Sequence, residues 1–420
     1  KSRHNPKADW YVWANADETG QPPNNWLSVF GGPAWQWNPW RGQYYLHNFL
    51  REQPDLNFHN PEVRQAVLDA CKHWLDLGVD GFRLDVCAFY THDPELKDNP
   101  PDPNPPTGSH FMFNPYVLQR HVNDIGQPSN VSFLEELRAL TDRYEDRVLL
   151  GELHQENGIQ LHKDYTAPGR LHLAYGYWLL GAEHLDAPLI RKTAEDLGHG
   201  DSDGWPCWAL DNHDFDRSPS RLGCVDRPEV SFAWHAAILS MRGAACIYQG
   251  AELGLPHADV PYHRMVDPYG IEFYPSYKGR DGSRTPMPWT HDRPHAGFSE
   301  AEPWLPVPPE HMPLSVDCQQ RTPGSLLNHF RTFLAWRRTQ PGLLHGGMAF
   351  LDGPEKTLCF TRPHGEEGVL CLFNLGDETA EFDLSALPAH EPLEGHGFGA
   401  HREGDILHLP GWQGYYGRLS

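Results

Sequence analysis

The sequence predicts an α/β fold built around a barrel of parallel strands, a (β/α)8 or TIM barrel. Three segments in chain order, 81–85, 151–154 and 211–214, each end an apolar, strand-like run with a carboxylate, and each run follows a helix-like segment. Repeated alternation of helix and strand implies a parallel sheet, and a long series of such units indicates a barrel. Because functional residues lie at the carboxyl ends of barrel strands, the three carboxylates should converge on one pocket.

Residues 1–58 precede the first of these units and are rich in Trp, Tyr, Asn and Gly. Aromatic side chains on loops either line a binding pocket or form a small separate core, and composition leaves both interpretations open. We therefore expect an inserted, loop-rich domain. Six tryptophans mark it: Trp10, Trp13, Trp26, Trp35, Trp37 and Trp40.

The first helix is predicted to begin at Asn60-Pro61, with Asn60 as the N-cap and Pro61 in the first turn. Apolar residues recur at helical spacing up to Leu77, and Gly78 is typical of a helix C-terminus. The strand 79–85 comes next.

A long Pro- and Asp-rich stretch, about residues 91–108, interrupts this rhythm. A loop of that length in a compact domain is usually functional or disordered. Its place after a barrel strand predicts that it overhangs the pocket. Beyond it, the pattern predicts helices at 133–144, 189–197, 230–239 and 326–338, and strands at 148–151, 171–175, 207–210 and 245–248.

After Pro341 the pattern changes to short apolar or alternating runs between Gly and Pro turns, at 357–361, 369–374 and 380–384. Such runs predict a small antiparallel β-sandwich domain. We therefore divide the chain into three parts: the loop-rich domain 1–58, the barrel 59–342 and the C-terminal β domain 343–420.

The net charge bounds the class of partner. With 34 Lys and Arg against 56 Asp and Glu, the chain carries a formal charge of −22. Such a chain repels nucleic acid and anionic membranes, so neither is an expected partner. The composition fits a soluble enzyme, monomer or homodimer, that acts on a neutral substrate.

The eight cysteines show neither paired nor metal-type spacing, and several lie in apolar runs. Free buried thiols in a reducing compartment are therefore favoured over a disulfide framework. No apolar run approaches the length of a membrane span. We expect a cytoplasmic protein.

Paired carboxylates in a pocket are the groups that glycoside hydrolysis requires. The segments Gly-Phe-Arg-Leu-Asp (81–85), Gly-Glu-Leu-His (151–154) and Asn-His-Asp (212–214) resemble the fourth-, fifth- and seventh-strand motifs of the α-amylase family, glycoside hydrolase family 13. Three further segments are similar to the oligo-1,6-glucosidase and α-glucosidase branch: residues 53–57, 248–254 and 279–289.

The resemblance implies that this chain carries barrel strands four to eight. It starts inside the domain inserted after the third strand, so strands one to three are expected to be absent, by truncation or because the record is partial. The family's structural calcium- or magnesium-type site would lie in that absent segment. No cofactor and no metal are expected here.

By resemblance, Asp85 is the nucleophile and Glu152 the general acid and base. Arg83, two residues before Asp85 on the same strand, points to the same face and should keep that carboxylate ionised. Glu152 has the opposite requirement, because it must first donate a proton. Partial burial near another carboxylate should raise its pKa.

Other residues are assigned to the substrate by resemblance. His213 and Asp214 should contact glucose hydroxyls beside the cleaved bond. Arg280 should lie near the non-reducing glucose, and its family partner, an aspartate on the second strand, falls in the absent segment. Arg280 is therefore expected to lack its counter-charge. The pocket wall is assigned to Phe30, Phe49 and Gln53.

Val86 introduces a conflict over linkage. Valine after the nucleophile goes with α-1,6 cleavage in this branch, whereas the surrounding sequence resembles α-glucosidases of short α-1,4 substrates. The sequence thus predicts a retaining α-glucosidase acting on small α-glucosides such as maltose, with transglucosylation as a second activity. An oligo-1,6-glucosidase with the same mechanism, or a truncated inactive homologue, remains the alternative.

Overall fold

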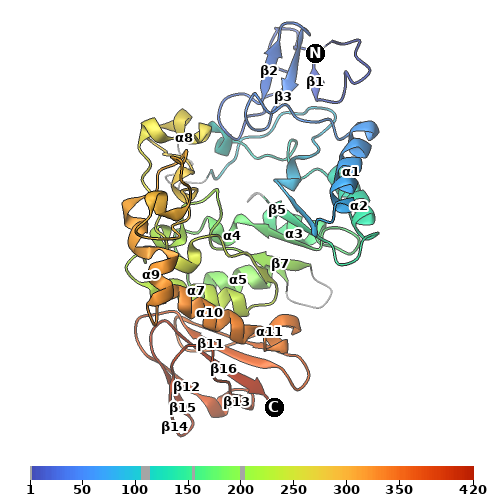
Figure 1. Cartoon of the computed structure of the whole chain (residues 1–420). Helices are drawn as coiled ribbons and strands as arrows, with labels where there is room; N and C mark the ends of the chain where they lie inside the picture. Colours follow the sequence, from blue (N-terminus) through green and yellow to red (C-terminus); the bar gives the residue numbers. More distant parts are fainter. Residues whose placement is uncertain (1, 106–113, 154–156, 199–203) are drawn as a thin grey trace. The chain divides into compact units, whose positions relative to one another are not determined.

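The computed structural model describes residues 2–105, 114–153, 157–198 and 204–420. These residues form two compact units (Figure 1). The first comprises Lys1–Gly176 and Pro268–Lys278, and the second comprises Tyr177–Asp267 and Gly279–Ser420. The three-domain division predicted above stays a prediction.

The first unit opens with a small antiparallel sheet in the order β1-β3-β2. Its strands are β1 (Trp13–Ala14), β2 (Trp35–Asn38) and β3 (Gln43–Leu46). Trp26 and Trp35, the first residue of β2, are buried, with stacked rings whose centroids lie 6.1 Å apart. At these two positions the tryptophans form a separate core.

Helix α1 (Pro61–Asp76) begins where the sequence predicts, because the Asn60 side chain accepts a hydrogen bond from the Glu62 N–H at 2.8 Å. It leads through Gly78, whose φ of 95° suits glycine, into the parallel sheet β4-β5-β6. The strands and the other helices of this part are β4 (Gly81–Leu84), β5 (Val148–Leu153), β6 (Leu173–Gly176), α2 (Ser129–Thr141) and α3 (Gly158–Tyr165).

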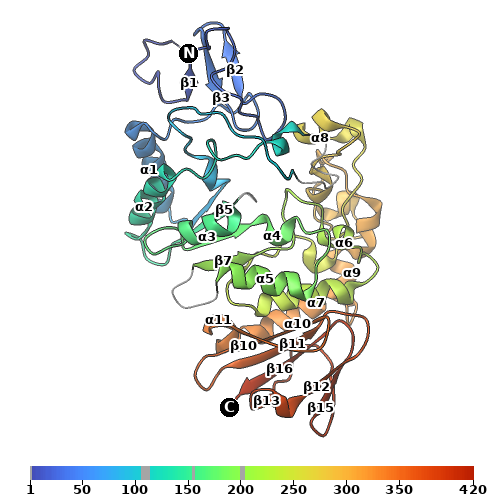
Figure 2. The ribbon, with the colours of Figure 1, turned by 180° about the vertical axis from the view of Figure 1, so that it is seen from behind.

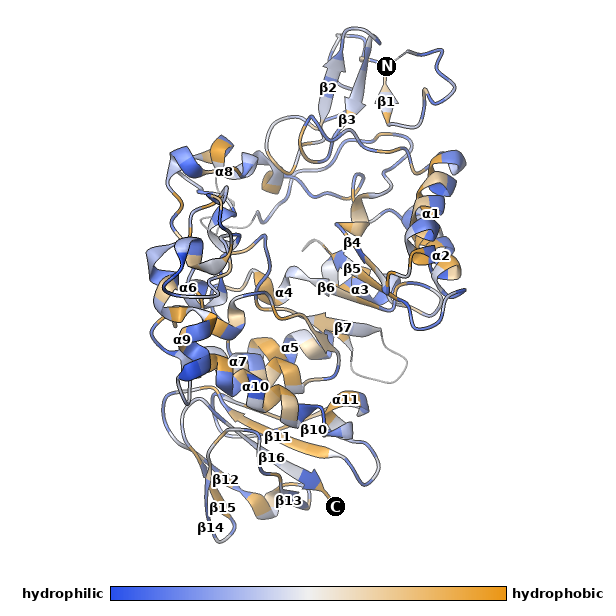
Figure 3. Cartoon of the chain, in the orientation of Figure 1, coloured by the Kyte–Doolittle hydropathy of each residue, from blue (hydrophilic) through white to orange (hydrophobic). Residues whose placement is uncertain are grey.

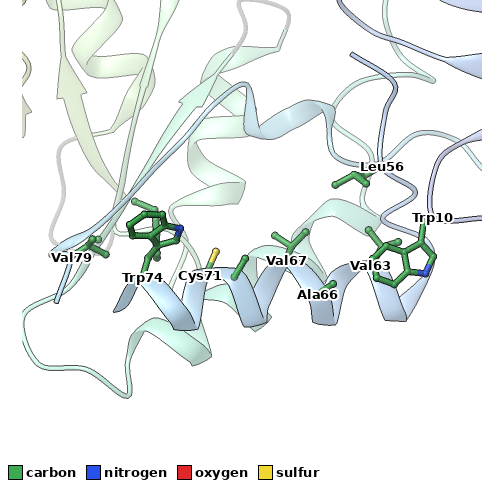
Figure 4. A pocket seen from close by; sticks show the side chains of 11 residues that line it. Trp10, Leu56, Val63, Ala66, Val67, Cys71, Trp74 and Val79 are labelled. Atoms are coloured by element: carbon green, nitrogen blue, oxygen red, sulfur yellow. The ribbon is translucent and has the colours of Figure 1, made fainter. Parts of the chain in front are cut away.

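An apolar groove of about 570 Å³ runs along α1 (Figure 4). Val63, Val67 and Cys71 line it from the helix, and Trp10 and Trp74 lie toward its two ends. Strand β4, which pairs with β5 in parallel register, contributes Gly81 and Phe82.

The long stretch after β4 is anchored to the aromatic-rich segment. Its described part, 91–105, contains no helix or strand apart from an isolated bridge at Pro101, and residues 106–108 of the predicted loop lie outside the described ranges. Asn24 and Trp26 donate side-chain hydrogen bonds to the carbonyls of Leu96 and Lys97 at 3.0 and 2.8 Å. This loop is therefore fixed to the first small sheet.

Short elements complete the first unit. They are η1 (Cys87–Phe89), η2 (Pro115–Leu118) and α8 (Pro268–Phe273). Helix α8 belongs to this unit although it is distant in sequence, and Tyr269 packs there against Phe30.

The second unit continues the alternation with β7 (Trp205–Trp208) pairing in parallel with β8 (Ala244–Ala245). Its α-helices are α4 (Tyr177–Leu180), α5 (Ala187–Leu197), α6 (Ser218–Arg221), α7 (Pro228–Ser240), α9 (Val316–Arg321), α10 (Leu326–Arg337) and α11 (Pro341–His345). Short 3-10 turns are η3 (Ala251–Leu253), η4 (Tyr262–Arg264), η5 (Asp281–Ser283), η6 (Pro294–Gly297), η7 (Pro309–Leu314) and η8 (Leu384–Ala386).

Helix α7 is the centre of this unit. Every residue from Val230 to Ser240 is buried, as expected of a helix that is apolar on all sides (Figure 3). It contacts α10 and strands β11 and β16, which lie close to it in Figure 2.

The C-terminal part forms two antiparallel sheets, as predicted. The first has the order β13-β16-β11-β10-β9 and the second the order β12-β15-β14. Their strands are β9 (Ala349–Leu351), β10 (Thr357–Arg362), β11 (Val369–Asn374), β12 (Ala380–Asp383), β13 (His390–Pro392), β14 (His401–Glu403), β15 (Ile406–Leu409) and β16 (Gln413–Leu419). Leu370 and Leu372 on one sheet pack with Leu407 and Leu409 on the other.

A buried arginine joins this β domain to α7. Arg362 of β10 has no exposed surface, and its guanidinium donates to the carbonyls of Ser240, Gly346 and Gly347 at 2.7, 2.8 and 2.7 Å. Ser240 is the last residue of α7, whose terminal carbonyls have no partner within the helix. Arg362 therefore caps the helix from the sheet.

The predicted type of each major element is confirmed, but several bounds differ. The helix predicted at 133–144 is α2, which begins earlier, at Ser129. The strand predicted at 207–210 spans Trp205–Trp208, and the one predicted at 245–248 is only Ala244–Ala245. In the part of the chain that the structure describes, no helix has the length and apolar character needed to cross a membrane.

Candidate active site

The predicted site residues fall into two groups, one in each unit, and each group is described by itself. In the first unit, parallel register brings three strand ends together. Leu84 lies opposite Gly151, and Glu152 lies opposite Tyr175. The side chains of Asp85, Glu152 and Tyr175 consequently project from neighbouring strand ends.

Arg83 links the two carboxylates of this group. Its Nη1 donates to Asp85 Oδ1, and its Nη2 lies 2.6 Å from Glu152 Oε2. The two carboxylates differ sharply in exposure, since the side chain of Asp85 is 72% exposed and that of Glu152 only 1%. Burial alone lowers the pKa of Arg83, but Tyr175 and the charge of Glu152 more than offset this and raise it.

Glu152 is surrounded by donors. Besides Arg83, the Val86 N–H donates to Oε2 at 3.1 Å and the Tyr175 hydroxyl donates to Oε1 at 2.7 Å. Donors on a carboxylate favour its charged form. The expected rise in the pKa of Glu152 therefore stays a prediction, and the visible contacts act against it.

Val86 has a strained backbone. Its φ of 37° and ψ of 50° lie in the left-handed region, which is costly for a β-branched residue. This conformation opens η1 and directs the Val86 N–H at Glu152. The sequence drew attention to the valine side chain, whereas the structure shows a role for its backbone.

The aromatic residues predicted to form a wall lie together in the first unit. Phe30 and Phe49 meet edge to face with centroids 5.6 Å apart, and Phe89 and Tyr269 extend the cluster at 5.2 Å from Phe49 and Phe30 respectively. Sequence reasoning missed Phe89 and Tyr269. Gln53 is exposed, and its side-chain oxygen accepts a hydrogen bond from the Leu50 N–H at 3.3 Å.

The second group lies after β7. Asp214 Oδ1 accepts hydrogen bonds from Arg280 Nη1 and Arg284 Nη2, both at 2.9 Å. His213 Nε2 lies 3.3 Å from Asp214 Oδ2. The Asp214 N–H donates to Asn212 Oδ1 at 2.8 Å, which fixes the turn that presents this carboxylate.

Arg280 does have counter-charges, so the expectation that it lacks one is wrong. Its Nη2 and Nε donate to the two carboxylate oxygens of Asp267 at 2.7 and 3.0 Å, in addition to its contact with Asp214. Burial raises the pKa of Asp267, but Arg280 more than offsets this and lowers it. Sequence reasoning missed Asp267 because it belongs to no motif.

Asp211, the first carboxylate of the third segment, has a structural role. It is buried, and its side chain accepts hydrogen bonds from the N–H and hydroxyl of Ser218 at the start of α6. His154, in the second segment, lies outside the described residues.

One group of side chains could hold a metal ion. Among the described residues, His291, Asp317 and Cys318 place ligand atoms within 4.8 Å of one another. Asp317 is already engaged there, because Arg321 and Ser315 donate to its two oxygens at 2.6 and 2.7 Å. This arrangement is satisfied by protein groups.

The chain is similar to known proteins over most of its length. The family described as "Alpha amylase, catalytic domain" matches residues 1–346. The chain is 44% identical over 426 residues to a probable alpha-glucosidase of Rhizobium meliloti, covering 100% of this chain and 77% of that protein. It is 32% identical to an oligo-1,6-glucosidase of Parageobacillus thermoglucosidasius, covering 91% of this chain and 72% of that protein.

Solved structures share the fold. The alpha-glucosyl transfer enzyme XgtA superposes with a TM-score of 0.94 at 46% identity, covering 100% of this chain and 78% of that one. The isomaltulose synthase SmuA from Protaminobacter rubrum superposes with a TM-score of 0.85 at 26% identity, covering 100% and 79%.

Proposed function

Because the chain belongs to the α-amylase family of glycoside hydrolases, family 13, we propose that it is a retaining α-glucosidase. It releases glucose from the non-reducing end of short α-glucosides such as maltose. The observation that carries this proposal is a pair of carboxylates, the exposed Asp85 and the buried Glu152. Each contacts one terminal nitrogen of the Arg83 guanidinium.

In the first step Asp85 attacks the anomeric carbon while Glu152 protonates the leaving oxygen. The bond from Asp85 Oδ to the sugar forms as the glycosidic bond breaks, and the leaving sugar departs with the proton of Glu152. Arg83 supports this step because its guanidinium donates to Asp85 Oδ1 and so holds the nucleophile in place.

In the second step Glu152 acts as a base. It removes a proton from water, which attacks the anomeric carbon and releases Asp85. Two inversions at the same carbon return the α configuration. A retaining site needs its two carboxyl groups about 5–5.5 Å apart, and we expect this separation between Asp85 and Glu152 in an undistorted site.

The proposal assigns sugar binding to Asp214 and His213, with Arg280 and Arg284 orienting Asp214. Hydrogen bonds from Asp214 to the ring hydroxyls would strengthen as the ring flattens toward an oxocarbenium ion. The aromatic cluster around Phe30 and Phe49 offers flat apolar faces for a pyranose ring.

Two finer points stay open to experiment. Transglucosylation, in which a sugar or alcohol replaces water, is supported by the likeness to an alpha-glucosyl transfer enzyme. Cleavage of α-1,6 links is the second candidate, supported by Val86 and by oligo-1,6-glucosidases among the relatives. Parallel kinetics on maltose and isomaltose separate the two linkages.

The test of the mechanism is a proton NMR time course of maltose hydrolysis. We expect α-glucose to appear first and to mutarotate afterwards. The appearance of β-glucose first would show an inverting enzyme and overturn the proposal.

A further inference from the structure

We propose that Tyr175 is a positioning residue for Glu152, whose hydroxyl stabilises the ionised form of that carboxyl and so sets the upper pH limit of glycosylation. The inference rests on the role proposed for Glu152. It concerns a residue of β6 that no sequence motif marks.

The geometry gives Tyr175 two partners at once. Its hydroxyl donates to Glu152 Oε1 at 2.7 Å and accepts from Arg83 Nη2 at 2.8 Å. Arg83 Nη2 also lies 2.6 Å from Glu152 Oε2. Tyr175, Arg83 and Glu152 therefore form a closed triangle in which the carboxylate only accepts.

The triangle is built into the sheet. Tyr175 lies opposite Glu152 in the β5–β6 register, and its side chain is buried. The guanidinium carbon of Arg83 lies 5.8 Å from the centroid of the Tyr175 ring. Phenylalanine would keep this ring packing and remove the hydroxyl alone.

Tyr175 can serve as a donor throughout the working pH range. Burial, followed by the charge of Glu152, raises the pKa of the Tyr175 phenol, so it stays neutral. A neutral phenol donates a stronger hydrogen bond to an ionised carboxylate than to a protonated carboxyl group. Its hydrogen bond therefore favours the ionised form of Glu152.

Further groups of the described residues lie close to Glu152 or its strand. Arg83 faces it from β4, and the Val86 N–H faces it from the turn after that strand. The Cys87 thiol donates to the Glu152 carbonyl oxygen at 3.3 Å and stays neutral because burial raises its pKa. Asp85 is an acidic residue near Glu152, and it accepts a hydrogen bond from the other guanidinium nitrogen of Arg83, Nη1.

Glycosylation requires the protonated form of Glu152. The ionisation of Glu152 therefore lowers kcat/KM as the pH rises. In Tyr175→Phe the ionised form loses one hydrogen bond. A hydrogen bond to a charged group corresponds to about one pH unit or more. We expect the alkaline limb of kcat/KM to move upward by about one unit, while the acid limb, which reports Asp85, stays in place.

The experiment records pH profiles of kcat/KM on maltose for the wild type, Tyr175→Phe and the matched control Tyr416→Phe. Tyr416 is equally buried and shares a hydrogen bond with Ser240 at 2.8 Å, far along the chain. The control should keep the wild-type profile. A ¹³C NMR titration of labelled glutamate follows the Glu152 carboxyl directly, with Glu152→Gln identifying its signal.

The outcomes separate the two proposals. An active Tyr175→Phe enzyme with an unmoved alkaline limb and an unmoved carboxyl titration overturns the role of Tyr175. A wild type without activity on any α-glucoside overturns the proposed function instead. A shift in both readouts, absent from Tyr416→Phe, supports the positioning role over a purely structural one.

Discussion

Asp85 is the residue on which the proposed chemistry depends most directly. Asp85→Ala should lower the rate on an activated aryl α-glucoside by about 10³-fold or more, because no covalent intermediate can form. The matched control is Asp80→Ala, whose side chain is 92% exposed and lies just before β4, at the opposite end of the strand. A loss below tenfold would remove Asp85 from the role of nucleophile.

Glu152 should show its role through the leaving group. In Glu152→Gln, glycosylation by an aryl glucoside with a good leaving group should be largely spared, whereas maltose, which needs the proton, should react far more slowly. Single-turnover kinetics on both substrates measure this step. Equal losses would argue against Glu152 as the acid, and Glu135→Gln, an exposed position on α2, serves as the control.

Sequence reasoning found the residues that lie in recognisable motifs. It missed residues whose partners are distant in the sequence and are brought close only by folding. Asp85, Glu152 and Asp214 lie in short motifs at strand ends, and their roles remain predictions. Tyr175 was not found because a tyrosine in an apolar strand is ordinary. Asp267 was not found because only the folded chain shows that it shares Arg280 with Asp214.

Among the elements, the loop before α1 carries a pH-sensitive carboxyl. Burial raises the pKa of Asp55 to about 7, although Asn48 donates to it from its N–H and side chain. Because the pKa of Asp55 is higher in the folded protein than in the unfolded chain, its contribution to the free energy of unfolding is full below the unfolded pKa. That contribution falls steadily as the pH rises from there to about 7.

Asp55→Asn should therefore raise the melting temperature more at pH 8 than at pH 5, because only part of this loss has occurred at pH 5. Asparagine keeps an oxygen that accepts from Asn48, and because Asp55 is partly exposed we expect a gain of only about 1–2 kcal/mol. Thermal unfolding at both pH values checks this, with exposed Asp69→Asn as the control. Equal effects at both pH values would contradict the assignment.

Because Arg362 caps α7, replacing it should measurably lower the stability of the protein. Arg362→Met should lower the free energy of unfolding by about 2–4 kcal/mol, because three carbonyls, two of them in buried residues, lose their donor. Urea unfolding measures it, with Arg331→Met on the exposed side of α10 as the control. Arg362→Lys should not restore stability, since one ammonium cannot reproduce the three directions of the fork.

Element types could be predicted because their periodicity and caps are local. The start of α1 follows from the side chain of Asn60. The bounds of β7 and β8 could not be predicted from the sequence. A strand ends where its neighbour stops pairing with it, and not where the apolar residues stop. The cap from Arg362 links segments more than a hundred residues apart and left no local signal.

For the molecule as a whole, the anchored loop after β4 predicts selectivity for short substrates. Rates should fall steeply from maltose to maltotetraose. Asn25→Ala should relax that fall, because it removes two hydrogen bonds at 2.9 and 2.8 Å between this residue and Asn99 of the loop. Asn104→Ala, in the same stretch, is the control. Comparable rates on starch and maltose would refute a pocket closed by this loop.

The burial of α7 also has a consequence for how the protein unfolds. With contacts to α10, β11 and β16 and with Arg362 at its end, α7 belongs as much to the C-terminal sheets as to the helices. Amide hydrogens of α7 and β11 should therefore exchange through one shared opening event. The C-terminal sheets would then act as part of one cooperative unit, and removing them to make a smaller catalyst would unfold the helices they cover.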